Sequence, residues 1–301
     1  DTARNGVDAL QKIEKEVPDV ITLDVEMPKM NGLDFLKRLM GKNPIPVVML
    51  SSVTDKGSKE TIKALELGAF DFITKPSGSI SLDIDKVKDE LVQKVELAAK
   101  SSVKEKISKQ VRRKSSLNKK ESISNKIDST KKSSSLRFSG SKTKLLVIGA
   151  STGGPKAIKE VMSSLPKSLR VAILIVQHMP AGFTKSLAKR LNKLSDFKVK
   201  EATDGDKIKI GTALLAPGDY HMLVKNGKIK LSQGPKVHNV RPAIDKTIGT
   251  VVKNYKKSIV GVLLTGMGKD GAKGMKLIKE FGGQTIAQDE ETSVVYGMPK
   301  V

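Results

Sequence analysis

A lysine- and serine-rich stretch divides this chain in two. Residues 100–144 carry 15 Lys or Arg against 3 Asp or Glu, together with 13 Ser. Such a segment buries too little apolar surface to offset the entropy lost on ordering. The sequence therefore predicts two folded parts, residues 1–100 and 144–301, joined by a basic flexible linker over residues 101–143.

The basic character of the chain raises the question of a nucleic-acid partner. The formal net charge is +23 at pH 7, a value that suits binding to polyanions. More than half of this excess lies in residues 100–144, and aromatic residues make up only 3% of the chain. A solvated tether explains the charge better than a nucleic-acid arm, because no basic helix with aromatic side chains accompanies it. We expect no nucleic-acid partner.

Residue types that the sequence lacks narrow the chemistry. Cysteine does not occur, which excludes disulfides, a thiol nucleophile and cysteine-ligated metal centres. Three histidines argue against a multi-histidine metal site. No apolar run approaches the roughly 20 residues of a membrane helix, and no signal peptide is visible. The sequence predicts a cytoplasmic protein without membrane insertion.

Short apolar runs alternate with amphipathic segments in residues 1–100. This order predicts a parallel, doubly wound α/β sheet, in which chemistry gathers at the carboxyl ends of the strands. The runs are Val20–Leu23, Val47–Leu50 and Phe70–Thr74, and they lead into Asp24, Ser51 and Lys75.

These three strand-end residues suit phosphoryl chemistry. A carboxylate such as Asp24 can accept a phosphoryl group, while a hydroxyl and an ammonium group can bind the phosphoryl oxygens. Each residue alone favours a plainer explanation, since Asp and Ser at strand ends often cap helices. The three together favour the phosphoryl site.

Residues 144–301 repeat the strand-then-helix order and predict a second parallel, doubly wound sheet. Three of its strand ends lead to a hydroxyl, an imidazole and a carboxylate, which are Ser151, His178 and Asp270. The expected strands are Lys144–Ile148, Val171–Val176, Ile259–Thr265 and Gln284–Gln288.

The segment Gly149–Gly153 fits the G-x-S-x-G pattern of a strand-to-helix elbow that exposes a serine hydroxyl. His178 could take the serine proton and Asp270 could orient the imidazole, while amides at the start of the new helix could stabilise an oxyanion. The chain order Ser, His, Asp differs from the Ser, Asp, His order of α/β-hydrolases.

Other assignments remain open at this point. The glycine-rich turn could cradle a nucleotide, although it does not match G-x-G-x-x-G or a P-loop. The rival bases are His221 and His238, and the rival acids are Asp204, Asp206, Asp219, Asp245 and Asp289.

The motifs LDVEMPKMNGLDFL, VVMLSS and GAFDFITKP resemble the receiver domain of two-component response regulators, a flavodoxin-like fold. The resemblance covers roughly residues 1–100. It implies that Asp24 is the phosphoacceptor, Ser51 the switch hydroxyl and Lys75 the characteristic receiver lysine. Phe72 falls where many receivers carry a switch aromatic.

Receivers begin with a strand whose end supplies an acidic pair for Mg²⁺. This chain opens at DTARNGVDAL, which resembles the end of the second strand and the second helix of a receiver. We therefore expect a receiver truncated at its start. Mg²⁺ is expected for receiver phosphorylation, but the acidic pair that helps to bind it is absent from this chain.

The motifs VIGASTGGPKAI, VQHMPAGFTKSLAKRLN, LLAPGDYHM and LLTGMGKDGAKGM resemble the catalytic domain of the CheB family of chemotaxis protein-glutamate methylesterases. The resemblance spans roughly residues 144–301. It implies that Ser151 is the nucleophile, His178 the base and Asp270 the acid of a triad, with Thr152 and Met267 beside the substrate and oxyanion.

The same resemblance implies a function in chemotaxis. Its substrates would be γ-methyl-glutamyl esters on the cytoplasmic helices of chemoreceptors, hydrolysed to glutamate and methanol, and specific receptor glutamines would be deamidated. Hydrolysis needs no cofactor, and no metal is expected in the catalytic domain. A chemotaxis histidine kinase would phosphorylate the receiver and thereby regulate the enzyme. The rival classes are a DNA-binding response regulator and a catalytically silent scaffold.

Overall fold

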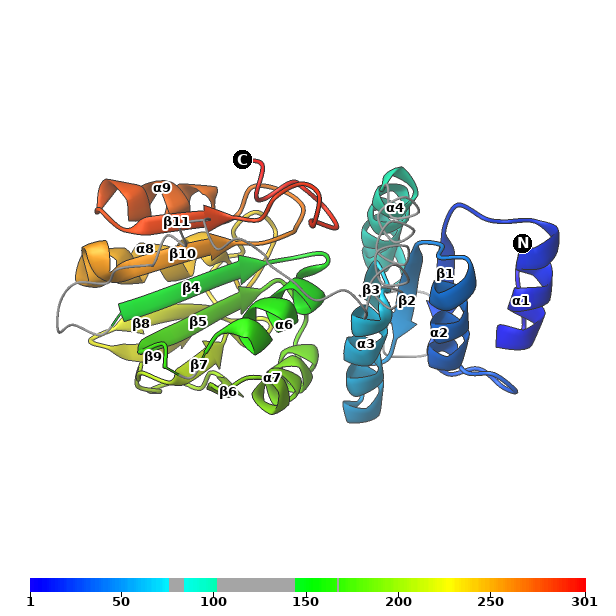
Figure 1. The fold of residues 1–301 in the computed structure, drawn as a ribbon, viewed down its shortest axis with the longest axis horizontal. Helices are drawn as coiled ribbons and strands as arrows, with labels where there is room; N and C mark the ends of the chain where they lie inside the picture. The colour runs from blue at the N-terminus through cyan, green and yellow to red at the C-terminus, as the bar shows by residue number, and fades with distance from the viewer. Residues whose placement is uncertain (76–83, 102–143, 167) are drawn as a thin grey trace, which may run out of the picture.

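The computed structural model describes residues 1–75, 84–101, 144–166 and 168–301. The predicted linker over residues 101–143 lies almost entirely outside the described residues. The rest of the chain forms two parallel α/β sheets that lie next to each other (Figure 1).

The N-terminal part is built on a parallel sheet of three strands in the order β1-β2-β3. Apolar side chains such as Phe35, Leu36 and Met49 are fully buried between this sheet and its helices. The elements are α1 (Gly6–Lys15), β1 (Ile21–Asp24), α2 (Gly32–Lys42), β2 (Val47–Ser51), α3 (Asp55–Leu67), β3 (Asp71–Thr74) and α4 (Ile84–Lys100). The predicted parallel α/β fold is confirmed, and each predicted strand is present within a residue or two.

Local sequence explains where these helices begin and end. The Asn31 side chain accepts a hydrogen bond from the amide of Asp34, and the Thr54 hydroxyl accepts one from Gly57, which caps α2 and α3. Gly68 ends α3 with a φ of 113°, a conformation that glycine adopts without steric cost.

The C-terminal part has a six-stranded parallel sheet in the order β11-β10-β4-β5-β7-β6. Its strands are β4 (Lys144–Ala150), β5 (Val171–Gln177), β6 (Lys198–Glu201), β7 (Thr212–Leu215), β10 (Ile259–Leu263) and β11 (Gln284–Ala287). An antiparallel hairpin of β8 (His221–Lys225) and β9 (Lys228–Ser232) stands beside it, and sequence analysis did not predict this hairpin or the pair β6 and β7.

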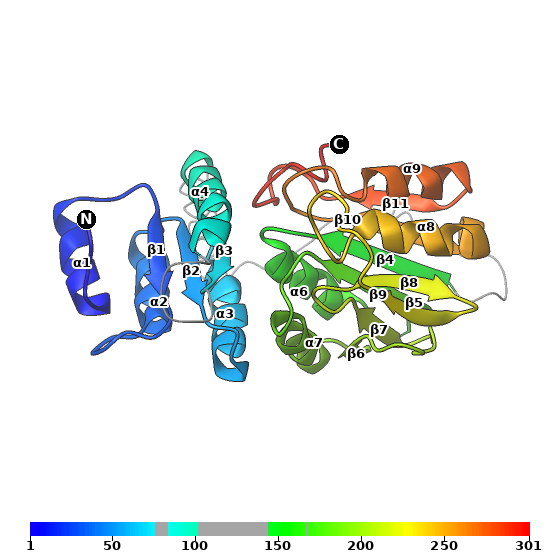
Figure 2. The same ribbon diagram turned by 180° about the vertical axis from the view of Figure 1, so that it is seen from behind.

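Helices cover both faces of this sheet (Figures 1 and 2). Alternate residues of the buried strands point to opposite sides. Ile148 and Ile173 pack with α6 (Gly154–Ser164) and α7 (Phe183–Leu194). Val147 and Leu174 pack with α8 (Ile244–Tyr255) and α9 (Ala272–Glu280). A short 3₁₀ helix, Lys256–Ser258, leads from α8 into β10.

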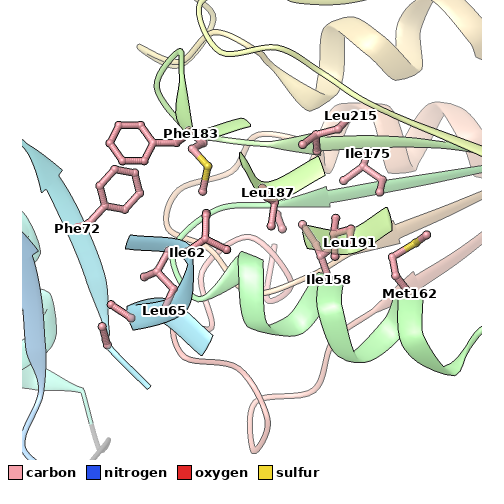
Figure 3. Close-up of a cluster of buried hydrophobic side chains, with 14 of the residues drawn as sticks. Ile62, Leu65, Phe72, Ile158, Met162, Ile175, Phe183, Leu187, Leu191 and Leu215 are labelled. Carbon is pink, nitrogen blue, oxygen red and sulfur yellow. The ribbon is translucent and has the colours of Figure 1, made fainter. Parts of the chain in front are cut away.

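The two sheets share one apolar cluster at the boundary between the parts (Figure 3). Helix α3 packs against α6 and α7, so that Ile62 and Leu65 join Leu187 and Ile158. The rings of Phe72 and Phe183 lie 4.5 Å apart between centroids. The N-terminal sheet thus lies against the carboxyl ends of the C-terminal strands.

Within the described residues, every helix is too short or too polar to span a membrane.

Candidate active site

Ser151 and His178 stand at the carboxyl ends of two paired strands. Ala150 lies opposite Gln177 in the register of β4 and β5, and the residue after each is Ser151 or His178. The amide of His178 donates a hydrogen bond of 3.0 Å to the carbonyl of Ala150, which continues the ladder to this point. Backbone pairing thus holds the two residues side by side.

The carboxylate of Asp270 reaches His178 from the other side of β4. Asp270 lies in the loop after β10, which pairs with β4. Its Oδ2 atom is 2.8 Å from Nε2 of His178, and the Asp270 side chain is only 2% exposed. Asp270 also accepts hydrogen bonds from the amides of Ile244 and Asp245 at the start of α8, at 2.7 and 3.1 Å.

These contacts set the charge of Asp270. Burial alone would raise its pKa, but the hydrogen bond and charge of His178 and the two amides at α8 outweigh burial, and the pKa of Asp270 falls below its ordinary value. Asp270 is therefore an anion at neutral pH. Asp270 contacts Nε2 of His178, so Nδ1 is the ring nitrogen that Asp270 does not engage.

Two glycines permit the turn that presents Ser151. Gly153 has a φ of 78° where the turn enters α6, and a Cβ there would lie 2.6 Å from the Val294 side chain. A Cβ on Gly266 would lie 2.6 Å from Cβ of Ser151, so glycine lets the loop after β10 approach the serine. The amide of Ser151 is tied to the carbonyl of Thr265 at 3.0 Å.

Gln177 is a site residue that sequence analysis missed. It is 2% exposed, and its Nε2 atom donates to the carbonyls of Ser151 and His178 at 2.9 and 3.0 Å. One amide group therefore braces both turns. A polar residue at the end of an otherwise apolar strand was the signal, because such a buried group needs partners.

The rival histidines hold other positions. His221 is 2% exposed; its Nδ1 accepts from the amide of Ala243 at 3.2 Å and its Nε2 contacts the carbonyl of Pro235 at 3.0 Å, so both nitrogens are in use. His238 lies 3.7 Å from Asp245. Burial raises the pKa of Asp245, and the nearby Asp270 charge adds to this effect.

Most rival carboxylates lie in separate structural contacts. Asp204 pairs with Lys230, Asp206 with Lys200 and Asp219 with Arg241, while Asp289 accepts from the amide of Thr292. Only Asp245 is close to Asp270. Ligand atoms of His238, Asp245 and Asp270 lie within 4.8 Å of one another, but both oxygens of Asp270 are already hydrogen-bonded, so this group does not fit a metal centre.

The side chain of Thr152 is bonded to the N-terminal part. Its hydroxyl donates a 2.7 Å hydrogen bond to the carboxylate of Asp71 in β3, and its carbonyl accepts from the hydroxyl of Thr265 at 3.0 Å. Asp71 also pairs with Lys94 at 3.5 Å. Thr152, the residue after Ser151, is thus bonded to the neighbouring sheet.

Met267, in the loop after β10, is 37% exposed.

The strand ends of the N-terminal sheet bring together two of the predicted residues. Lys75 forms an ion pair and a hydrogen bond with Oδ2 of Asp24, while the amide of Glu26 donates to Oδ1. The Ser51 hydroxyl is fully buried. It donates to the carbonyl of Gly57 at 3.3 Å, and it also contacts the Thr61 hydroxyl. It faces α3 rather than Asp24.

The described residues do not assemble a Mg²⁺ site at Asp24. Of the described strands in this sheet, only β1 ends in a carboxylate, and both oxygens of Asp24 already accept hydrogen bonds. Glu26 pairs with Lys56 at 3.3 Å. Mg²⁺ prefers an octahedral set of oxygen ligands that includes carboxylates, and these groups do not supply it.

Comparison with known proteins divides the chain into the same two parts as the fold. Residues 1–84 match the family model "Response regulator receiver domain", and residues 146–301 match "CheB methylesterase". The solved structure of the "Thermotoga maritima CheB methylesterase catalytic domain" is similar, with 49% identity and a TM-score of 0.51, and the match covers 53% of this chain and 87% of that chain.

Two relatives match along essentially the whole of this chain. A "Protein-glutamate methylesterase/protein-glutamine glutaminase" of Symbiobacterium thermophilum is 48% identical over 309 residues, which cover 100% of this chain and 82% of the relative. A relative of the same name from Pyrococcus abyssi is 46% identical over 99% of this chain and 78% of its own length.

The fold, the side chains at the strand ends and the two family-model matches define the class of the protein. It is a response regulator whose output domain is a parallel α/β enzyme domain. Within that class, the chain belongs to the CheB family of protein-glutamate methylesterases/protein-glutamine glutaminases.

Proposed function

We propose that this protein hydrolyses γ-methyl esters of glutamate side chains on the cytoplasmic helices of chemoreceptors and deamidates specific receptor glutamines. The observation that carries the proposal is the 2.8 Å contact between Asp270 and His178 at the strand end beside Ser151. Family membership supports the choice of substrate. The protein would act in the cytoplasm, during chemotactic adaptation.

In the first half of the reaction, the Ser151 hydroxyl attacks the ester carbonyl while Nδ1 of His178 takes its proton. Asp270 is ionised and buried, so it stabilises the imidazolium that results. Amides at the start of α6 stabilise the oxyanion, and Met267 would lie beside the substrate together with Thr152 once Thr152 is released from Asp71. The tetrahedral intermediate collapses, the C–O bond breaks, and methanol leaves with the proton from His178.

Water completes the cycle. His178 takes a proton from water as the water oxygen attacks the acyl-serine. The second tetrahedral intermediate then collapses, the bond between the acyl carbon and the Ser151 oxygen breaks, and His178 returns the proton to Ser151. The product is glutamate. With a glutamine side chain the first step breaks a C–N bond instead, ammonia leaves, and the same hydrolysis gives glutamate. No step draws on a metal or a cofactor.

We also propose that the receiver, residues 1–100, inhibits the catalytic domain, residues 144–301, by covering it. Asp71 and Phe72 of β3 contact Thr152 and Phe183, and Lys75 follows β3 directly. A chemotaxis histidine kinase would transfer a phosphoryl group from its phosphohistidine to Asp24, breaking a P–N bond and forming a P–O bond. Ser51 and Lys75 would then engage the phosphoryl oxygens, and Phe72 would move with β3.

The nucleophile provides the direct test. Ser151→Ala should abolish methanol release from methylated receptor and ammonia release from receptor glutamine, with an unchanged circular dichroism spectrum. Ser163→Ala makes the same change on the exposed side of α6 and should retain full activity. A fluorophosphonate probe should label Ser151 in the unaltered protein. Turnover by Ser151→Ala would disprove the assignment.

A further inference from the structure

A basic groove lies between α3 of the N-terminal part and α6, α7 and β6 of the C-terminal part, with a volume of about 1170 Å³. Its wall includes the buried apolar side chains of Ile62, Ala188 and Val199. Around them stand seven lysines: Lys59, Lys63, Lys159, Lys185, Lys189, Lys193 and Lys200. Apolar walls and a cationic border suit an amphipathic, acidic ligand.

The charge of the basic groove is not balanced from within. Lys200 pairs with Asp206 at 2.7 Å, whereas none of the other six lysines has an ion-pair partner in the part of the chain that the structure describes. The two acidic residues of the groove do not neutralise these six lysines, since Glu66 binds Arg190, which also lines the groove, at 2.8 and 2.9 Å, and Glu201 accepts from Thr184 at 2.6 Å. The surplus positive charge attracts an anionic partner.

The lysines of α7 form a stripe. Lys185, Lys189 and Lys193 are spaced by four residues, so they lie on one face of the helix, and all three are exposed. The opposite face of α7 buries Leu187 and Leu191 in the core. A partner helix with carboxylates at similar spacing could meet this stripe along its length.

Two of the helices that line the basic groove start just after the proposed catalytic residues. Helix α6 starts at Gly154, just after Ser151, and α7 starts at Phe183, just after His178. Both helices run away from these residues, and both contribute lysines to the groove. A segment that lies along α6 and α7 could therefore run from the Ser151 site into the groove.

A helix already rests on this surface. Helix α3 packs against α7, and its Glu66 makes two hydrogen bonds to Arg190. Glu66 thereby shows that a carboxylate on a packed helix can engage this face of α7. Arg190 makes a bidentate contact of the kind that favours carboxylates.

From these observations we infer that the α6 and α7 side of the basic groove is the docking surface for the acidic protein segment that carries the methylated glutamates, and that α3, the opposite wall of the groove, covers part of this surface in the packed state. The inference rests on the proposed function. The chemistry supports it, because every turnover leaves a new glutamate carboxylate on the substrate and the segment around the reacting ester is accordingly anionic.

Neutralisation of the α7 stripe in the full chain tests this inference. The triple variant Lys185→Gln, Lys189→Gln, Lys193→Gln should raise KM for methylated receptor by about five- to tenfold and flatten its dependence on salt. Hydrolysis of a small ester, p-nitrophenyl acetate, should be unchanged because that ester needs no groove. The matched control is Lys225→Gln, Lys253→Gln, Lys257→Gln, three exposed lysines outside the groove that remove the same charge.

The outcomes separate the explanations. An unchanged KM for receptor would overturn the docking surface, and so would an equal loss with both esters, which would indicate an effect on domain packing or folding. An unchanged KM accompanied by loss of duplex DNA binding would assign the groove to nucleic acid and likewise overturn it. If the unaltered protein hydrolyses the small ester but not the receptor ester, the proposed function itself fails, whatever the lysines do.

Discussion

The hydroxyl of Thr152 donates a 2.7 Å hydrogen bond to the carboxylate of Asp71, so the residue next to the proposed nucleophile is tied to the receiver. Asp71 is 9% exposed and also binds Lys94. Burial would lower the pKa of Lys94, but the charges of Asp71 and Glu90 outweigh burial and raise it, so this lysine stays cationic and holds Asp71 in place. The contact joins the receiver to the turn that follows Ser151.

Loss of this contact should raise basal activity. Hydrogen bonds to charged groups contribute about 1.5–3 kcal/mol, so Asp71→Ala should shift the balance towards the released receiver by about tenfold or more. Methanol release from methylated receptor without a phosphodonor measures the change. Glu90→Gln is the matched control, since it removes the other ion pair of Lys94 and keeps the bond to Thr152. Equal basal rates in Asp71→Ala and the unaltered protein would contradict inhibition by coverage.

The ring pair of Phe72 and Phe183 should be measurable as a coupling between the two parts. Aromatic pairs contribute about 0.5–1.5 kcal/mol beyond the area that they bury. Phe72→Leu, Phe183→Leu and the double variant form a double-mutant cycle, with denaturant unfolding as the measurement. A coupling energy near zero would show that the rings do not touch in solution and that the receiver is not packed there.

Acidification should weaken the stability that Asp270 provides. Its pKa in the folded state is lowered, so its contribution is fully present above the ordinary carboxyl pKa and is lost as the pH falls through the folded value. We expect the difference in unfolding free energy between the unaltered protein and Asp270→Asn to be largest near neutral pH and to shrink below about pH 4. Chemical unfolding across a pH series measures it, and a difference that grows on acidification would refute the prediction.

Gln177 should affect turnover more than stability. Its Nε2 atom braces the carbonyls of Ser151 and His178, whereas its Oε1 atom is buried without a hydrogen-bond partner among the described residues. Gln177→Leu keeps the volume, removes the brace and removes this unsatisfied oxygen, so the melting temperature should change little. We expect kcat to fall by about tenfold with KM for small esters unchanged, because misplaced catalytic groups slow the chemical step. A large loss of stability with normal kcat would assign Gln177 a purely structural role.

Much of the fold could be predicted from local patterns. Residues 171–176 of β5 are a continuous apolar run, and strand-then-helix order permits few topologies. The strands β6, β8 and β9 were missed because exposed lysines interrupt their apolar pattern, and β7 was missed because it has only four residues. The positions of Ser151, His178 and Asp270 after strand ends made them candidate site residues, and the resemblance of their motifs to the CheB family favoured them over the other histidines and carboxylates.

The sequence by itself determined that two parallel sheets would each carry reactive side chains at their strand ends. The alternation of strands and helices along the chain and the glycine-rich elbow at Ser151 are both short-range patterns. Only the tertiary structure decided that Asp270 rather than Asp245 bonds His178, that His221 is fully engaged elsewhere, and that Asp71 reaches Thr152. These contacts join residues that are far apart along the chain, and their geometry depends on how whole sheets and helices pack, which no local pattern encodes.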